Sequence, residues 1–308
     1  MKATRDSFGE AILKWGEKDS RVVVLDADLS KSTKSESFSK KFPGRFFQMG
    51  IAEMNMIGTA AGLALSGKIP FACSFGCFLT GRYDQIRMSV AYNRANVKLI
   101  GTHAGVAIGE DGHSQMALED IGLMRALPNM IVLQPADHIE TLKMMEAMIE
   151  TSNPCYLRLT RQKLPMIYDE SYRFKIGKWD LLREGRDVLL IGTGHQVHSC
   201  LEANDKKARS WTVVNASSLS PIDKDLLKDL ISRHRFVVTA EDHYVTNGLG
   251  SAVAEFLAEN SCDARLLRIG LRDFGESGTP EELYQHFKLD GEGVLSQVEE
   301  FLQAQNDR

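Results

Sequence analysis

The sequence predicts an α/β protein with a doubly wound parallel sheet, followed by a smaller α/β domain. Three observations support this prediction. Short apolar runs rich in β-branched residues alternate with stretches of helical pattern, the alternation lapses once near the middle of the chain, and it then starts again. Such alternation is typical of βαβ units, in which helices cover both faces of a parallel sheet. A chain of 308 residues has room for about two domains of ~150 residues each.

The first half of the chain supplies a complete set of strands and helices. A wholly apolar run such as Val22–Leu25 is typical of a parallel strand that is buried on both faces. The expected strands are Val22–Leu25, Ile69–Cys73, Val97–Gly101, Met130–Leu133 and Tyr156–Leu159. The expected helices lie near 53–66, 82–94, 116–126 and 137–150. Small residues crowd the helix at 53–66, so we expect it to be buried.

The pattern lapses over 161–180, where a proline and mixed charges occur. We therefore expect a first domain at 1–165, a surface linker at 166–180 and a second domain at 181–308. The expected strands of the second domain are Val188–Ile191, Thr212–Asn215, Phe236–Thr239 and Arg265–Ile269, and its expected helices lie near 196–207, 223–232, 247–258 and 291–304.

Composition excludes several classes of function. The net charge is −4 and no Lys/Arg-rich block occurs, so we expect no nucleic-acid partner. No apolar run approaches the ~18 residues of a membrane span or resembles a signal peptide, so we expect no membrane association. The five cysteines form no CxxC pair and are expected to be free thiols in a reducing, cytoplasmic compartment.

Loops after the expected strands are the places to search for a site, because ligands of open α/β sheets bind beyond the carboxyl ends of the strands. The loop after the first strand contains Asp26, Asp28 and Ser32, which could also be a helix cap or a solvated turn. Glu53 falls in the first turn of a helix, where it could simply complement the helix dipole. A buried acid is costly without a partner, however, and that cost indicates function.

Two further loops are unusual in content. Phe75 and Phe78 follow a strand, where aromatic residues are usually core but could also form a platform for a heteroaromatic ring. Residues 103–115, HAGVAIGEDGHSQ, form a long glycine-rich loop with several polar groups. Long polar loops are usually functional. The glycine spacing matches neither a P-loop nor a dinucleotide fingerprint.

Together these segments resemble the pyrimidine-binding domain of the thiamine-diphosphate-dependent transketolase family. The motifs that resemble it run in order over most of the chain: RFFQMGIAEMN, THAGVAIGEDG, ALEDIGLMRALPNM, VLQPAD and LTRQKLP, then VTAEDHYVTNGLGSAVAEFL and GLRDFGESGTPEELYQHF of the C-terminal domain. In the family, a preceding domain holds the cofactor diphosphate through Mg²⁺ or Ca²⁺ with a GDG…N motif. That motif does not occur in this sequence.

The resemblance therefore implies the C-terminal half of a split transketolase, which moves a two-carbon ketol unit between sugar phosphates. It implies an N-terminal partner subunit that carries the GDG…N motif and the metal, self-association in an α₂β₂ assembly, and no metal ligand in this chain. Thiamine diphosphate would meet this chain on its pyrimidine side.

The resemblance also implies roles for cofactor-binding residues. Glu53 matches the glutamate that hydrogen-bonds N1′ of the aminopyrimidine and favours the imino tautomer, which removes the proton from thiazolium C2. Phe75 and Phe78 match the aromatic pocket around the pyrimidine, with Tyr83 as a weaker candidate. Asp28 matches an acid near the cofactor and the subunit contact.

On the substrate side, Arg5, Ser32, His103 and Arg161 match positions that bind a sugar phosphate. The fork of an arginine suits phosphate oxygens. Asp111 matches the acid that reads a substrate hydroxyl. The expected catalytic residues are thus Glu53, His103 and Asp111. One departure is that Gln115 stands where family members usually carry a histidine, and His113 lies two residues earlier.

Other interpretations stay open at this point. The β subunit of a 2-oxo-acid dehydrogenase has a similar length and domain order, but it needs no sugar-phosphate arginines. A 1-deoxyxylulose-5-phosphate synthase is normally one long chain. The departure at Gln115 could also indicate a degenerate paralogue that binds a partner without turnover.

Overall fold

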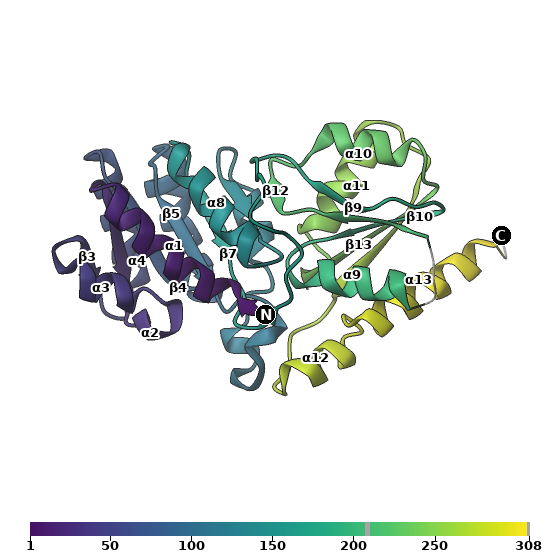
Figure 1. Cartoon of the computed structure of the whole chain (residues 1–308), viewed down its shortest axis with the longest axis horizontal. Coiled ribbons are helices and arrows are strands. Elements are labelled where there is room, and N and C mark those ends of the chain that lie inside the picture. Colours follow the sequence, from purple (N-terminus) through teal and green to yellow (C-terminus); the bar gives the residue numbers. More distant parts are fainter. Residues whose placement is uncertain (207–209, 307–308) are drawn as a thin grey trace.

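The computed structural model describes residues 1–206 and 210–306 and shows two α/β domains side by side (Figure 1). Each domain has its own sheet with helices on both faces, as the sequence predicts. In this described part of the chain, no helix combines the length and the apolar content that crossing a bilayer requires.

The first sheet has seven strands in the order β12-β6-β7-β5-β4-β2-β3. All neighbours are parallel except β12, which runs antiparallel to β6. Every strand predicted in this half is present, with ends shifted by one or two residues, whereas β3 was not predicted. The bounds are β2 Val22–Asp26, β3 Phe46–Gln48, β4 Ile69–Phe75, β5 Lys98–Thr102, β6 Ile131–Leu133, β7 Cys155–Arg158 and β12 Ser218–Ser220.

Helices cover this sheet, with α1 and α8 together on the face turned to the viewer in Figure 1. The helix α8 begins where the Asp137 carboxylate accepts the N–H of Glu140 at 2.8 Å. The helical bounds are α1 Thr4–Lys18, α2 Ser30–Thr33, α3 Glu36–Lys41, η1 Pro43–Arg45, α4 Glu53–Leu65, α5 Gly76–Thr80, α6 Tyr83–Gln85, η2 Ile86–Tyr92, η3 Val106–Asp111, η4 His113–Gln115, α7 Asp120–Arg125 and α8 His138–Glu150. A small pair of strands, β1 Lys2–Ala3 and β8 Lys163–Leu164, joins the two ends of the domain.

Three helix predictions need correction. The helix expected at 116–126 begins only at Asp120, because Ala117 is extended and its carbonyl accepts the N–H of Gly105 at 3.0 Å. The helix expected at 82–94 is divided into α6 and the π-helix η2. The helix α4 is buried on one side only: Met54 is 50% exposed and Leu65 is 66% exposed.

The second sheet has the order β14-β13-β10-β11-β9, in which only β9 is antiparallel to its neighbour. Its predicted strands and helices are present among the described residues, β9 and α12 are additional, and residue 207, at the end of the helix expected near 196–207, lies outside the described residues. The bounds are β9 Asp180–Arg183, β10 Val188–Gly192, α9 His195–Asp205, β11 Thr212–Asn215, α10 Lys224–Ile231, β13 Phe236–Tyr244, α11 Leu249–Glu259, β14 Arg265–Leu271, α12 Pro280–His286 and α13 Gly291–Asn306. The expected boundaries at 165 and 180 stay a prediction.

A buried ion pair lies where the two domains meet. The Nε of Arg158 donates to both carboxylate oxygens of Asp120, at 3.1 and 2.9 Å. The same guanidinium donates to the carbonyl of Asp242 in the second domain at 2.8 Å. The side chains of Arg158 and Asp120 are 2% and 0% exposed. Removal of one partner would therefore leave an unpaired buried charge.

We expect Asp120→Ala to lower the free energy of unfolding by about 3–5 kcal/mol, because Arg158 then stays buried without its counter-ion. Equilibrium unfolding in urea measures this loss. Asp229→Ala is the control, since Asp229 pairs with Arg233 on an exposed helix end at 2.9 Å and should cost far less. Equal losses for the two variants would contradict the role of the buried pair.

Candidate functional site

The candidate site lies at the carboxyl edge of the first sheet. The segments that follow β2 and β5 contribute Ser32 and His103, Phe75 is the last residue of β4, and Arg161 follows β7. The first turn of α1 adds Arg5. The structure therefore places these predicted residues at the edge of the sheet where ligands of this architecture bind.

Arg5 and His103 form the centre of a hydrogen-bond chain. The Nη1 of Arg5 donates to the carbonyl of Ser32 at 3.2 Å and to Nε2 of His103. A guanidinium can only donate, so Nε2 is the acceptor and Nδ1 carries the proton. Nδ1 then donates to the hydroxyl of Thr102 at 2.9 Å, and this hydroxyl donates to the carbonyl of Ser74 at 3.3 Å. The tautomer of His103 is thus fixed by its neighbours.

Burial, and then the positive charge of Arg5, lower the pKa of His103 to about 3. The imidazole is therefore neutral at physiological pH. His103 orients Arg5 without adding positive charge to the site.

Two arginines give the site its charge. The Nε of Arg5 is buried and has no hydrogen-bond partner among the described residues. Burial lowers the pKa of Arg5, Asp6 opposes this shift, and the nearby charge of Arg161 adds to it. Two guanidinium groups within electrostatic range of each other, one with a free donor, suit an anion with several oxygens.

Arg161 and Asp111 lie together on the outer side of the site. Their side chains are 3.8 Å apart and are 44% and 54% exposed. Nη1 of Arg161 also donates to the carbonyl of Ile108 at 3.0 Å. The structure thus places Arg161, the predicted phosphate-binding residue, beside Asp111, the acid expected to bind a substrate hydroxyl.

Glu53 begins α4 and is only 5% exposed. Its Oε1 accepts the hydroxyl of Ser74 at 3.0 Å. Ser74 also accepts from Thr102 through its carbonyl, so Glu53 is linked to His103 through two hydroxyl residues. A carboxylate can accept at both oxygens, and the bond from Ser74 leaves Oε2 available to a ligand.

Phe75 and Phe78 stack with ring centroids 5.5 Å apart and an angle of 8° between their planes. The ring of His103 packs against Phe75 at 3.9 Å. Tyr83 is half-buried and packs against the hydrophobic cluster that includes Met56 and Ile57. The structure therefore joins Phe75 and Phe78 with His103, whereas Tyr83 contributes to the core beside them.

Asp28 is exposed at a turn with φ +64°. Its N–H donates to Oε1 of Gln48 at 2.8 Å, and the same oxygen accepts the N–H of Gly50 at 3.2 Å. Asp28 is thus tied to the segment that leads into Glu53. The buried acid of this loop is Asp26, whose pKa burial raises.

The residues near the departure from the family pattern have other partners. Nδ1 of His113 accepts the N–H of Gly275 at 3.1 Å, and its ring meets the ring of Phe274 edge-on at 4.7 Å. The carbonyl of Gln115 accepts the thiol of Cys77 at 3.1 Å. His113 therefore faces the second domain.

Sequence reasoning missed Ser74 and Thr102. Both are fully buried hydroxyl residues at the carboxyl ends of buried strands. Each directly precedes a predicted site residue, Phe75 or His103. A hydroxyl at the end of an otherwise apolar strand was the available signal.

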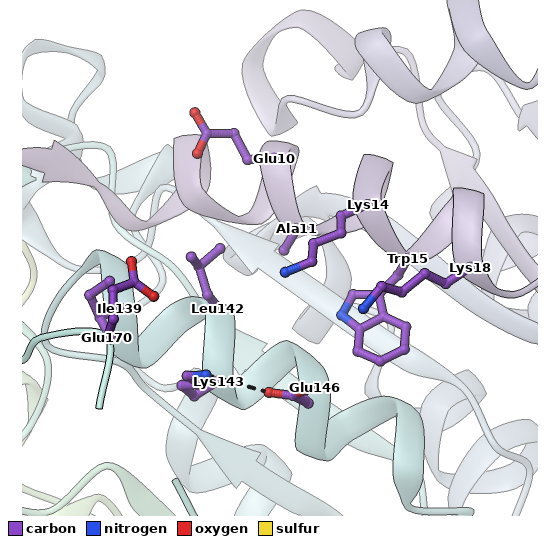
Figure 2. A pocket seen from close by; sticks show the side chains of 10 residues that line it. All are labelled: Glu10, Ala11, Lys14, Trp15, Lys18, Ile139, Leu142, Lys143, Glu146 and Glu170. Carbon is purple, nitrogen blue, oxygen red and sulfur yellow. Dashed lines mark ion pairs between the residues drawn. The ribbon is translucent and has the colours of Figure 1, made fainter. Parts of the chain in front are cut away.

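A separate hollow of about 200 Å³ lies between α1 and α8, apart from this site. Figure 2 shows Lys14, Trp15 and Lys18 on α1 at one side of the hollow, and the ion pair of Lys143 with Glu146, both on α8, at the other side. Its volume is below the ~300–1,000 Å³ of common ligand pockets. Its lining contains three lysines and three glutamates, so it offers no excess of either charge. In the described ranges, no group of three or more His, Cys, Asp or Glu side chains could hold a metal.

Comparison with known proteins gives consistent results for both domains. Residues 1–166 match the family "Transketolase, pyrimidine binding domain", and residues 177–294 match "Transketolase, C-terminal domain". The chain is 44% identical over 306 residues to a protein of Methanocaldococcus jannaschii that is named as a transketolase C-terminal section. The aligned residues make up 97% of this chain and 96% of that protein. The chain is 38% identical over 309 residues to a 6-deoxy-6-sulfo-D-fructose transketolase subunit of a Clostridium species, covering 99% and 96%.

A solved structure gives the same result. A split gene transketolase, described as an inactive β4 tetramer, superposes with a TM-score of 0.90 at 41% identity, covering 97% of this chain and 98% of the other. The chain spans about half the length of the mammalian transketolases that it also matches, 48% in the human and rat proteins.

Proposed function

The chain belongs to the transketolase family, and from this premise we propose that it moves a two-carbon ketol unit between sugar phosphates, together with a subunit that completes the cofactor site. The observation that carries the proposal is the hydrogen bond from Arg5 to a neutral His103, with Arg161 near enough for its charge to lower the pKa of Arg5. Two cations without an added histidine charge form an anion site, and Glu53 is linked to it through Ser74 and Thr102.

The cofactor side of the site fits the pyrimidine of thiamine diphosphate. When bound, the cofactor supplies the carbon chemistry of the reaction. A buried carboxylate, Glu53, with one oxygen free would accept or exchange a proton at N1′. The stacked rings of Phe75 and Phe78 would pack against the heteroaromatic ring. Asp28 and Tyr83 would lie at the edge of this pocket.

On the substrate side, Arg5 and Arg161 would bind the phosphate, with Ser32 beside them. In the present arrangement Nε2 of His103 is occupied by Arg5, so His103 would position that guanidinium first. Asp111, which lies 3.8 Å from Arg161, would accept a hydrogen bond from a hydroxyl of the sugar. Recognition of phosphate and of hydroxyl would thus be coupled by one ion pair.

Assembly is part of the proposal. An N-terminal subunit with a GDG…N motif would hold the diphosphate and Mg²⁺ or Ca²⁺. Self-association in an α₂β₂ enzyme is supported by exposed apolar side chains on α4 and η2, namely Met54, Leu65, Met88 and Tyr92. A cytoplasmic location is also proposed, since all five cysteines are free.

Steady-state turnover with xylulose 5-phosphate and an aldose acceptor, in the presence of an N-terminal transketolase subunit, tests this function. Ketol transfer is the expected result. Transfer of an acyl unit from a 2-oxo acid would instead indicate the dehydrogenase β subunit, and binding of the partner without any turnover would indicate a degenerate paralogue.

We expect Arg161→Ala to raise KM for phosphorylated sugars by at least about tenfold, because one of two charged contacts to the phosphate is lost. Cofactor affinity should stay nearly unchanged, and unphosphorylated donors should be affected far less. Arg233→Ala, in an exposed ion pair distant in sequence from the site, is the control and should keep KM unchanged. Equal losses for phosphorylated and unphosphorylated donors would mean that Arg161 has only a structural role.

A further inference from the structure

The second domain packs against a loop of the first domain that carries two of the proposed substrate-binding residues. This loop, residues 103–115, contains His103 and Asp111, and its Ile108 carbonyl accepts from Arg161. The turn η3 within it packs against α12, and Figure 1 shows α12 at the lower edge of the molecule, next to this loop. The loop is therefore in contact with residues more than a hundred positions away in the sequence.

Asp242 of β13 makes the central contact. Its Oδ1 accepts the N–H of Val106 at 3.0 Å, and its Oδ2 accepts the hydroxyl of Tyr284 at 2.8 Å. Its carbonyl accepts from the buried Arg158 at 2.8 Å. Asp242 is only 3% exposed. Both carboxylate oxygens and the backbone are thus fixed, and the carboxylate in turn fixes Val106, the first residue of η3.

The neighbouring Gly105 shows how closely the carboxylate approaches the loop. A Cβ at this position would lie 2.0 Å from Oδ2 of Asp242. Gly105 also has φ +84°, a conformation that favours glycine. The backbone of the loop is therefore in direct contact with the acid, and the turn that ends at Asp111 starts from this contact.

The rest of the loop is packed in the same way. A Cβ at Gly112 would lie 2.4 Å from Oγ of Ser277, and one at Gly109 would lie 3.2 Å from Cδ of Pro280. His113 accepts the N–H of Gly275 at 3.1 Å. Segment 275–284 thus lies against the loop on both sides of Asp111, while Arg161 contacts Asp111 itself.

We propose that Asp242 is a positioning residue for sugar recognition. It fixes Val106, and through the short turn η3 it sets the place of Asp111. The second domain then contributes to substrate affinity without touching the substrate. This inference rests on the proposed function for the role of Asp111, whereas the hold of Asp242 on the loop rests on the contacts alone.

The test compares Asp242→Ala with Asp223→Ala in the full chain assembled with its partner subunit. Asp223 is equally buried in the second domain, at 3% exposed, but its carboxylate accepts from Leu226, Trp179 and Lys178. Asp242→Ala should raise KM for the ketose phosphate between about tenfold and a hundredfold, because a misplaced Asp111 no longer meets the substrate hydroxyl. Cofactor affinity and kcat should change little. Asp223→Ala should lower stability and leave KM unchanged.

Two further variants distinguish a positioning role of Asp242 from a loss of folding. Asp242→Asn retains a carbonyl acceptor for Val106 and should recover most of the lost affinity, whereas loss equal to that of the alanine variant would overturn the positioning role. If Asp242→Ala does not fold, Tyr284→Phe removes only the donor to Oδ2 and should raise KM in the same direction, by less.

Amide hydrogen exchange of residues 104–112, followed by mass spectrometry, does not depend on turnover. It should be faster in Asp242→Ala than in Asp223→Ala or the parent. Unchanged exchange in a folded Asp242→Ala would overturn the inference. Absence of ketol transfer by the parent enzyme would overturn the proposed function instead, and the exchange measurement would still decide whether Asp242 holds the loop.

Discussion

Glu53→Gln is expected to reduce activity by ~10²–10⁴-fold or more, the range of a general acid–base group. A carboxyl group can exchange a proton with a ring nitrogen, whereas an amide cannot. Glutamine keeps the size of the side chain and can still accept the hydroxyl of Ser74 through its carbonyl oxygen. The variant, assembled with its partner subunit, should therefore fold normally.

The rate of deuterium exchange at C2 of the cofactor separates this role from a structural one. It should be much slower in Glu53→Gln than in the parent. A first-turn acid that only complements the helix dipole is worth ~0.3–1 kcal/mol. On that interpretation, the substitution would slightly lower the melting temperature and leave C2 exchange intact. Exchange at the parental rate would exclude Glu53 as the activating acid.

The second large effect expected is that ketol transfer requires a partner subunit. The chain matches the pyrimidine-binding and C-terminal domains of the family and spans 48% of the length of human transketolase. The purified chain should show no turnover of a ketose phosphate in the presence of thiamine diphosphate and Mg²⁺. Addition of an N-terminal transketolase subunit should restore turnover. Full activity of the chain alone would contradict the proposed division of the enzyme.

The sequence predicts strands of this fold well because they are buried on both faces. Val22–Leu25 and Val188–Ile191 are continuous apolar runs within β2 and β10, of the kind that a parallel sheet covered on both faces accommodates. The strand Ser218–Ser220 escapes prediction because three residues carry little pattern and its partner, β6, lies some eighty positions earlier. The predicted start of a helix at residue 116 is wrong for a similar reason. The hydrogen bond from the N–H of Gly105 to the carbonyl of Ala117 keeps this segment extended despite its local helical preference.

The same distinction holds for the candidate site. Resemblance to the family names Glu53, Arg5 and Arg161, because each stands in a recognisable local motif. The neutral state of His103 depends on burial and on the charge of Arg5, 98 positions away, and no local motif encodes it. The contact of Val106 with Asp242 spans 136 positions. Such properties arise from packing between distant segments, which sequence patterns alone do not specify.

Calorimetric titration of thiamine diphosphate in the presence of Mg²⁺ tests the central claim most directly. The purified chain should bind the cofactor weakly or not detectably, because it provides the pyrimidine side of the site only. The chain mixed with an N-terminal subunit should bind the cofactor tightly, with Mg²⁺ required. Tight Mg²⁺-dependent binding by the chain alone would contradict the claim that this protein is one half of a split transketolase.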